Sequence, residues 1–199
     1  PGYAEACIKY IREITGWDIK LSDNLIEATH DTSCMVAYAS ALKMIAIRMS
    51  KICNDLRLLS SGPRTGIAEI SLPPKQPGSS IMPGKVNPVI PEVVNQVCFK
   101  VIGNELTVCL ASEAAQLELN VMEPVMVQSI VQSSDWLIRA FDTLRIECID
   151  GIKANPDHCK HMVEHSIGIV TALKPFIGYS KSTEIAKEAL ETGGSVYQL

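Results

Sequence analysis

The sequence predicts an all-α protein, built as a bundle of long helices with a small helical appendage near the C-terminus. Hydrophobic residues make up 47% of the 199 residues, whereas aromatic residues make up only 5%. The core must therefore come from aliphatic side chains, the mixture that long packed helices favour. Apolar residues also recur in alternating steps of three and four along three long stretches, which is the spacing of one helix face. A chain of this length can bury a substantial core without metals or disulfides.

The first long helix is expected from Thr32 to Leu59. Asp31 or Thr32 is expected to cap its start, because short polar side chains accept hydrogen bonds from the free amides of a first turn. Residues 60–63, Ser-Ser-Gly-Pro, supply the turn chemistry that ends it. Its apolar seam runs through Leu42, Ile45, Met49, Ile52, Leu56 and Leu59.

A second long helix is expected after Pro88, because proline suits a first helical turn, and a third between Pro124 and Gly151. Seams with a sustained seven-residue repeat must be buried against helices of similar length. The other faces are also apolar, as at Ile47 and Ile102, so neighbouring subunits are expected to complete the bundle. The second seam runs through Val94, Val97, Val101, Val108, Ala111 and Ala115 with Asn104 as its polar position, and the third through Ile130, Ser134, Leu137, Phe141, Leu144 and Cys148.

Smaller elements are expected outside the bundle. Residues 1–151 are assigned to a central helical bundle domain that includes the loop 62–87, and 152–199 to the start of a small C-terminal helical domain. The chain begins at Pro1 without methionine and stops just after Ser195 offers a helix cap, so a fragment of a longer protein is expected. The smaller elements are helices at Tyr3 to Ile14, Asp157 to Val163 and Lys181 to Glu191, short segments at Ser22 to Ala28 and Ala68 to Leu72, and a connector at Leu173 to Tyr179.

Composition excludes several classes of partner. The formal charge of -4 and the absence of any Lys/Arg-rich face argue against binding to nucleic acid or to an anionic membrane. Seven cysteines without a CxxC pair indicate free thiols in a reducing compartment. No signal peptide and no uninterrupted apolar run of membrane-spanning length are found. A soluble cytoplasmic protein is expected.

The connection from Gly62 to Asn87 carries the most chemical information, because loops of about 26 residues in compact domains are more often functional than idle. It combines glycines, two adjacent serines, a lysine and an amide immediately before an expected helix N-terminus, where negative charge is favoured. Ser79 or Ser80 could serve as a base only if nearby donors strongly stabilise its alkoxide. The alternative is an ordinary polar surface loop rich in glycine and proline.

This loop resembles the signature of the aspartase/fumarase superfamily. Residues 78–87 read GSSIMPGKVN, with Glu92 five residues further on, and match the pattern GSSxMPxKxN-x4-E at every defined position. Three stretches are similar to the aspartase branch rather than to class II fumarases: PVIPEVVNQV at 88–97, MEP at 122–124 and SIGIVT at 166–171. The resemblance covers essentially the whole chain.

The resemblance implies reversible anti-elimination of ammonia from L-aspartate to give fumarate through an aci-carboxylate intermediate. It implies Ser79 as general base, Ser80, Lys85 and Asn87 as substrate-binding residues, and Glu92, Gly78, Ile81 and Met82 as supporting residues. It further implies a homotetramer whose subunits share active sites, and a loop that closes as a lid. No cofactor is required by that reaction, and a divalent cation as activator is left open. The other signature segments of the superfamily lie outside this chain, so the fragment alone is expected to be inactive.

Two other functions and one metal site remain as alternatives. A class II fumarase would use the same Ser79 to remove water from malate, and a crystallin-like scaffold would keep the fold without catalysis. The intact Ser79, Lys85 and Asn87 argue against the scaffold. His158, His161 and His165 share one helix face at metal-ligand spacing, but a solvated face is the preferred interpretation because no second cluster completes the site.

Overall fold

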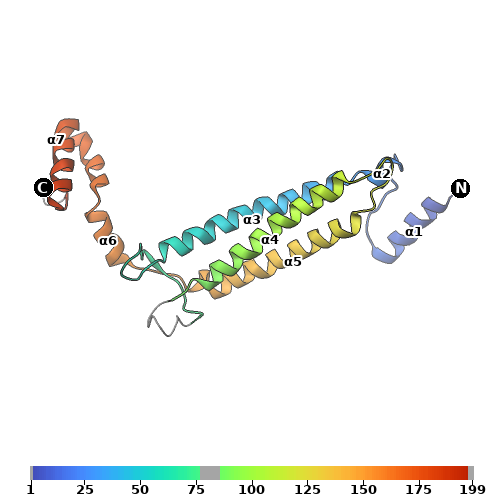
Figure 1. Ribbon diagram of the computed structural model, residues 1–199, viewed down its shortest axis with the longest axis horizontal. Coiled ribbons are helices and arrows are strands. Elements are labelled where there is room, and N and C mark those ends of the chain that lie inside the picture. The colour runs from blue at the N-terminus through green and yellow to red at the C-terminus, as the bar shows by residue number, and fades with distance from the viewer. Residues whose placement is uncertain (1, 77–85, 197–199) are drawn as a thin grey trace. The chain divides into compact units, whose positions relative to one another are not determined.

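The computed structural model describes residues 2–76 and 86–196, and within them the regular structure is mostly helical (Figure 1). The all-α prediction is confirmed. The elements in chain order are α1 (Tyr3–Thr15), α2 (Glu27–His30), α3 (Ser33–Leu59), β1 (Ile70–Ser71), α4 (Val89–Glu113), α5 (Glu123–Glu147), a 3-10 turn (Ile149–Gly151), β2 (Lys153–Ala154), α6 (Pro156–Glu164), a second 3-10 turn (Ile167–Ile169) and α7 (Val170–Thr192).

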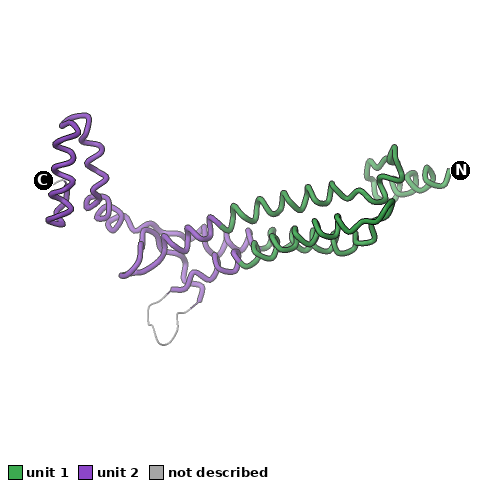
Figure 2. Tube along the Cα trace, turned by 45° about the horizontal axis from the view of Figure 1, so that its top comes forward, with its two compact units in different colours: residues 1–50, 96–139 green, residues 51–95, 140–199 purple. Residues whose placement is uncertain are grey.

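The chain divides into two compact units (Figure 2). Unit 1 comprises residues 1–50 and 96–139, and unit 2 comprises residues 51–95 and 140–199. The helices α3, α4 and α5 each continue from one unit into the other. The domain boundary predicted after residue 151 is a different division and stays a prediction.

In unit 1, α3, α4 and α5 lie side by side around a small apolar core. Met126 of α5 and Val108 of α4 are fully buried, and Ala39 and Ala111 pack against them. Met35, Val36 and Ile130 close the edges of this cluster. The small residues allow close helix approach, while methionine adapts to the irregular space between them. The predicted seams include Val108 and Ala111 of α4 and the flanking Ile130 of α5, but not Met126.

Buried polar side chains in unit 1 have hydrogen-bond partners in side chains and in the backbone. Asn104, the one polar residue in the predicted seam of α4, donates from its amide to the Ser133 hydroxyl at 3.0 Å and to Gln132 at 3.2 Å. Asn120 donates to the carbonyl of Ala111 at 3.1 Å and accepts from the amide of Met122 at 2.8 Å. A buried amide without partners is costly, so these networks fix which parts of α4 and α5 face each other.

The seam of α3 differs from the prediction. Leu42, Met49 and Leu56 are partly buried as expected, but Ile45 and Ile52 are each 44% exposed. The buried positions are instead Ala39, Ala46 and Cys53. Alternation in steps of three and four fits two adjacent stripes of an apolar helix equally well, and the helices here approach along the stripe with the smaller residues.

A partly buried ion pair joins α3 to α4 in unit 1. Lys43 Nζ lies 2.5 Å from Glu105 Oε1, and the Ser40 hydroxyl donates to the same oxygen at 3.0 Å. The Glu105 residue is only 7% exposed. The hydrogen bond from Lys43 lowers the pKa of Glu105 below its ordinary value of 4.5, outweighing the opposing effect of burial. Burial and, to a lesser degree, the same carboxylate raise the pKa of the Cys109 thiol.

We expect Lys43→Met to lower the free energy of unfolding at pH 7 by about 2 kcal/mol, because a carboxylate is left buried without its cation. The figure lies below that for a fully buried pair because the Lys43 side chain is 34% exposed. A depressed folded-state pKa gives stability that is present above the unfolded-state pKa and lost as pH falls through the folded value. The difference in unfolding free energy between parent and variant should therefore shrink below about pH 4.5. Urea titrations at pH 7 and at a pH below about 4.5 measure it.

Lys51→Met is the matched control, because Lys51 pairs with Asp55 one turn along the same helix and its side chain is 72% exposed. Exposed pairs of this kind contribute less than about 0.5 kcal/mol. Equal losses for the two variants, or a Lys43→Met loss that grows on acidification, would contradict the assignment of a stabilising charge at Glu105.

The C-terminal part of unit 2 is a helical hairpin with its own core. Val170, Ala189 and Val196 are buried together, packed by residues of the preceding 3-10 turn. The predicted helix at Lys181 to Glu191 is present within α7, but the predicted connector at Leu173 to Tyr179 is mostly helical. The break is confined to Gly178, whose φ of 82° and ψ of 169° leave the helical region. Glycine adopts this conformation without a Cβ clash, so it bends the chain in a single residue.

Helix α4 is long and apolar enough to pass a length and composition test for membrane crossing. Its Val94, Val101 and Val108 are buried, as the core helix of a bundle requires. Cys53, Cys98 and Cys148 are buried, and burial raises the pKa of Cys98 and Cys148. These three act as small core residues, whereas Cys34 is exposed.

Candidate active site

Only some of the predicted site residues lie among the residues that the structure describes. Asn87 and Glu92 lie within the described residues, at the start of α4 in unit 2. The prediction that a lid closes over the site falls on residues outside that range. The remaining predicted residues also lie outside the described residues: Gly78, Ser79, Ser80, Ile81, Met82 and Lys85.

Asn87 and Glu92 frame the N-terminus of α4. The Glu92 amide donates to the Pro88 carbonyl at 3.1 Å, which is the first hydrogen bond of the helix, and the Val89 amide donates to the Asn87 carbonyl at 2.9 Å. Pro88 has no amide hydrogen, so it leaves no donor unsatisfied at this position, as predicted. Half-buried Glu92 places a carboxylate in the first turn, where the helix dipole stabilises negative charge. This geometry is consistent with a supporting role for Glu92.

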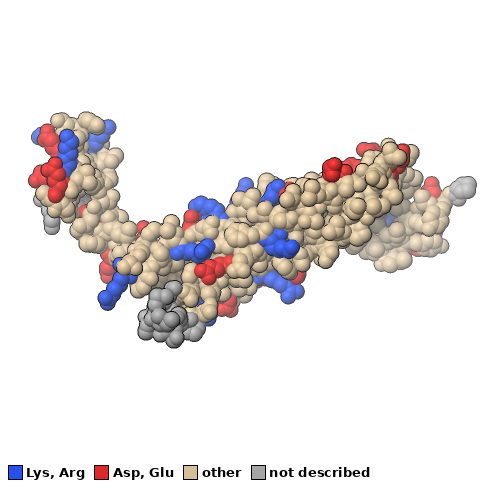
Figure 3. All heavy atoms as spheres, in the orientation of Figure 1, with Lys and Arg blue, Asp and Glu red and all other residues tan. Residues whose placement is uncertain are grey.

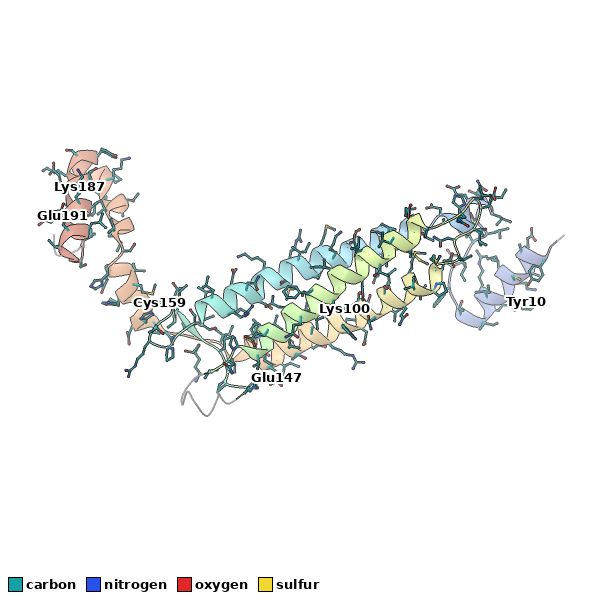
Figure 4. The ribbon with its side chains drawn as sticks, viewed as in Figure 1. Tyr10, Lys100, Glu147, Cys159, Lys187 and Glu191 are labelled. Carbon is teal, nitrogen blue, oxygen red and sulfur yellow. The ribbon has the colours of Figure 1, made fainter. Side chains whose placement is uncertain are left out.

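The two stems of the loop, 67–75 and 86–88, converge beside the end of α5. Leu72 and Pro73 of the first stem and Asn87 and Pro88 of the second line one small cavity with Cys148. Its volume of about 10 Å³ has room for barely one water molecule, so the stems are closely packed. In the first stem, Lys75 forms an ion pair with Glu147, the last residue of α5, which is labelled in Figure 4.

The first stem also pairs with the segment before α6. Strand β1 runs antiparallel to β2, with Ile70 opposite Ala154 and Ser71 opposite Lys153. The predicted strand at Ala68 to Leu72 is therefore present, although only two of its residues form the ladder. Its partner strand was not predicted, because two residues carry no periodic signal in a sequence.

A larger cavity of about 130 Å³ opens beside these stems. Its polar side chains are already engaged: the Ser71 hydroxyl donates to Asn155 at 3.1 Å, and the Ser60 hydroxyl donates to the Leu56 carbonyl at 2.7 Å. The described residues that line this cavity include no lysine or arginine. The cavity is lined by Ser60, Gly62, Pro63, Ala68, Ile70, Ser71, Leu72, Val86, Pro88 and Asn155.

The three histidines near α6 have other partners. His158 Nε2 lies 2.8 Å from the carbonyl of Ile67, and His165 Nδ1 lies 2.8 Å from the carbonyl of His161. His161 and His165 contact each other with ring centroids 4.0 Å apart. No group of three metal-ligating side chains that could hold an ion occurs among residues 2–76 and 86–196. His158 thus contacts the first stem, a role that its spacing did not reveal.

Asn155 is the residue near the loop that sequence reasoning missed. The pair Asn155-Pro156 reads as a helix start, and its contacts with the stem join residues 84 to 87 positions apart. A single sequence carries no signal for such a contact.

Two family models match the chain, one in its N-terminal half and one at its C-terminal end. A family model described as Lyase matches residues 1–103, and one described as Fumarase C C-terminus matches residues 169–199. The chain is 59% identical over 199 residues to an aspartate ammonia-lyase of Pseudomonas aeruginosa, covering 100% of this chain and 42% of that relative. The chain therefore spans less than half the length of this curated relative.

Two solved structures share the fold over 98% of this chain. A structure described as fumarate lyase:delta crystallin from Brucella melitensis, in native form, has a TM-score of 0.94 at 53% identity and is covered over 46% of its length. A recombinant class II fumarase from Schistosoma mansoni has a TM-score of 0.85 at 28% identity and is covered over 44% of its length.

Proposed function

The chain belongs to the lyase family whose model matches residues 1–103, and on that basis we propose that the complete protein removes ammonia from L-aspartate to give fumarate. The observation that carries the proposal is the match at every defined position of the loop 78–87 and Glu92. The 59% identity to an aspartate ammonia-lyase, against 28% to a class II fumarase, supports ammonia as the leaving group.

In the proposed reaction, Ser79 takes a proton from the carbon next to the side-chain carboxylate of the substrate. The electron pair moves onto that carboxylate, giving an aci-carboxylate with two negative charges, and ammonia then leaves from the neighbouring carbon. Stabilising this dianion is the main task of the site, because the proton is very weakly acidic. Lys85 and Asn87 supply the donors, with Ser80 shaping the site, and the positive end of α4 lies next to Asn87.

Glu92, Gly78, Ile81 and Met82 complete the proposal as supporting residues. Glu92 has the geometry for it, since a carboxylate in the first turn of α4 stabilises the helix end that follows the loop. The glycine permits close backbone approach to a substrate. The reaction so described runs on side chains and backbone amides, without a required cofactor.

We further propose a cytoplasmic homotetramer whose subunits share active sites. Large apolar side chains remain exposed on the bundle helices of unit 1, including Phe99 and Leu110 at 59% and 60% and Ile138 at 65%. Charged residues are interspersed between wide uncharged areas on the face drawn in Figure 3. Exposed apolar surface along long helices is typical of an interface between subunits.

L-Aspartate and L-malate distinguish the proposed reaction from its closest alternative. We expect the complete protein to form fumarate from L-aspartate at least about a hundredfold faster than from L-malate, since a site built for one leaving group leaves polar groups unpaired with the other. Fumarate absorbance measures both reactions, and an ammonia assay confirms the product. Fumarate from malate alone would identify a hydratase, and an assembled protein inactive on both substrates would identify a scaffold.

A further inference from the structure

Asn155 ties the segment before α6 to the first stem of the loop through three hydrogen bonds. Its side-chain amide donates to the Ala68 carbonyl at 2.7 Å, and its backbone amide donates to the Glu69 carbonyl at 2.9 Å. Its side-chain oxygen accepts from the Ser71 hydroxyl at 3.1 Å. All of these residues belong to unit 2. The half-buried Asn155 side chain thus contacts Ala68 before Glu69 and Ser71 after it.

The residue that Asn155 holds has an unfavourable backbone conformation. Ala68 has a φ of 48°, in the left-handed region that a residue with a Cβ occupies at a cost of about 1–2 kcal/mol. Its amide donates to the Ser61 carbonyl at 2.8 Å, and its carbonyl is the acceptor for Asn155. Both polar groups of a buried, strained residue are therefore satisfied, and the side-chain amide of Asn155 supplies one of the two bonds.

Three further contacts hold the rest of the stem. His158 donates from Nε2 to the Ile67 carbonyl at 2.8 Å, because a carbonyl can only accept. Pro73 lies so close to Gly151 that a Cβ at residue 151 would be 2.6 Å from its Cγ. The Lys75–Glu147 ion pair is the last of the three. Residues between 147 and 158 thus contact the stem at each end and at its centre.

We propose that Asn155 is a positioning residue for the lyase reaction: it holds Ala68 in the left-handed conformation and so sets the course of the first stem, which precedes the signature loop in the chain. This inference rests on the proposed function. It assigns a catalytic consequence to a residue outside the signature loop, 76 positions after Ser79 in the sequence.

Asn155→Asp tests the role in the complete protein. The substitution keeps the shape and the acceptor for Ser71 but replaces the donor to Ala68 with an oxygen that repels the carbonyl. An aspartate also suits the N-cap of α6, so that helix is preserved. We expect kcat to fall about tenfold, because the loss of one partly buried hydrogen bond disturbs the geometry of the base. The acidic limb of the pH profile of kcat/KM, which reports the base, should move to higher pH by about one unit.

Amide hydrogen exchange gives a readout that needs no turnover. The Ala68 amide donates to Ser61 and the Glu69 amide donates to the Leu59 carbonyl at 3.0 Å. Release of the Ala68 carbonyl loosens this turn, so both amides should exchange about tenfold faster in Asn155→Asp. Unchanged exchange at these two amides would overturn the proposal that Asn155 holds Ala68 in its conformation.

Rescue by glycine tests whether the effect passes through Ala68. Glycine adopts the left-handed region without steric cost, so Ala68→Gly in the Asn155→Asp background should recover at least about a third of the lost kcat. It should also return the pH profile towards that of the parent. A double variant no better than Asn155→Asp would show that Asn155 does not act through the conformation of Ala68.

Lys160→Ala is the matched control, because Lys160 lies in α6, is exposed and pairs with Glu164 of the same helix. Its kcat, pH profile and amide exchange should equal those of the parent within about twofold. If Asn155→Asp gives the control's kcat and pH profile, the positioning role is wrong. A parent protein that releases no ammonia from L-aspartate would overturn the proposed function instead. The exchange experiment would then still test whether Asn155 holds Ala68.

Discussion

Ser79→Ala in the complete protein is expected to lower kcat for L-aspartate by about three orders of magnitude, because it removes the proposed base. Of the other polar side chains in the signature loop, Asn87 is an amide and Lys85 is ordinarily a cation, so Ser80 is the one alternative base. Assembly should be unchanged, because the substitution deletes a single hydroxyl. Fumarate absorbance under saturating substrate measures kcat, and size-exclusion chromatography measures assembly.

Two other serines make the result specific. Ser80→Ala should cost far less, because the resemblance gives Ser80 a part in shaping the site and no proton to carry. Ser180→Ala, at an exposed position on α7, should leave kcat unchanged. A loss for Ser80→Ala as large as that for Ser79→Ala, or near-normal turnover of Ser79→Ala, would reassign the base.

Lys85→Met is expected to raise KM about tenfold and to lower kcat about a hundredfold. A charged hydrogen bond to the substrate carboxylate contributes to binding, and the same cation stabilises the second negative charge that forms only in the aci-carboxylate. The loss in kcat should exceed the loss in binding, because charge on the carboxylate grows during the reaction. Steady-state kinetics with L-aspartate separate the two constants.

Lys187→Met is a matched control on α7, where Lys187 is exposed and labelled in Figure 4. Its KM and kcat should match those of the parent. Unchanged affinity in Lys85→Met would remove Lys85 from the site. A change in KM with normal kcat would leave it a substrate-binding residue with no part in stabilising the intermediate.

The sequence sufficed to predict the three long helices, because local periodicity reports them directly. The predicted seam of α4 matches the buried positions Val94, Val101 and Val108, and Leu137 and Leu144 are buried on α5. On α3 the stripe was misplaced by one position at Ala46 and Cys53. An apolar helix offers several plausible faces, and only the approach of its partners selects one of them.

For the candidate site, the linear pattern of residues 78–92 determined which side chains were named, because that chemistry is compressed into one loop and the start of one helix. The tertiary structure decided what holds the stems of that loop: the pairing of β1 with β2, the left-handed Ala68 and the hydrogen bonds of Asn155. These contacts join residues more than eighty positions apart. They depend on chain closure and packing, which leave no periodic mark in a single sequence.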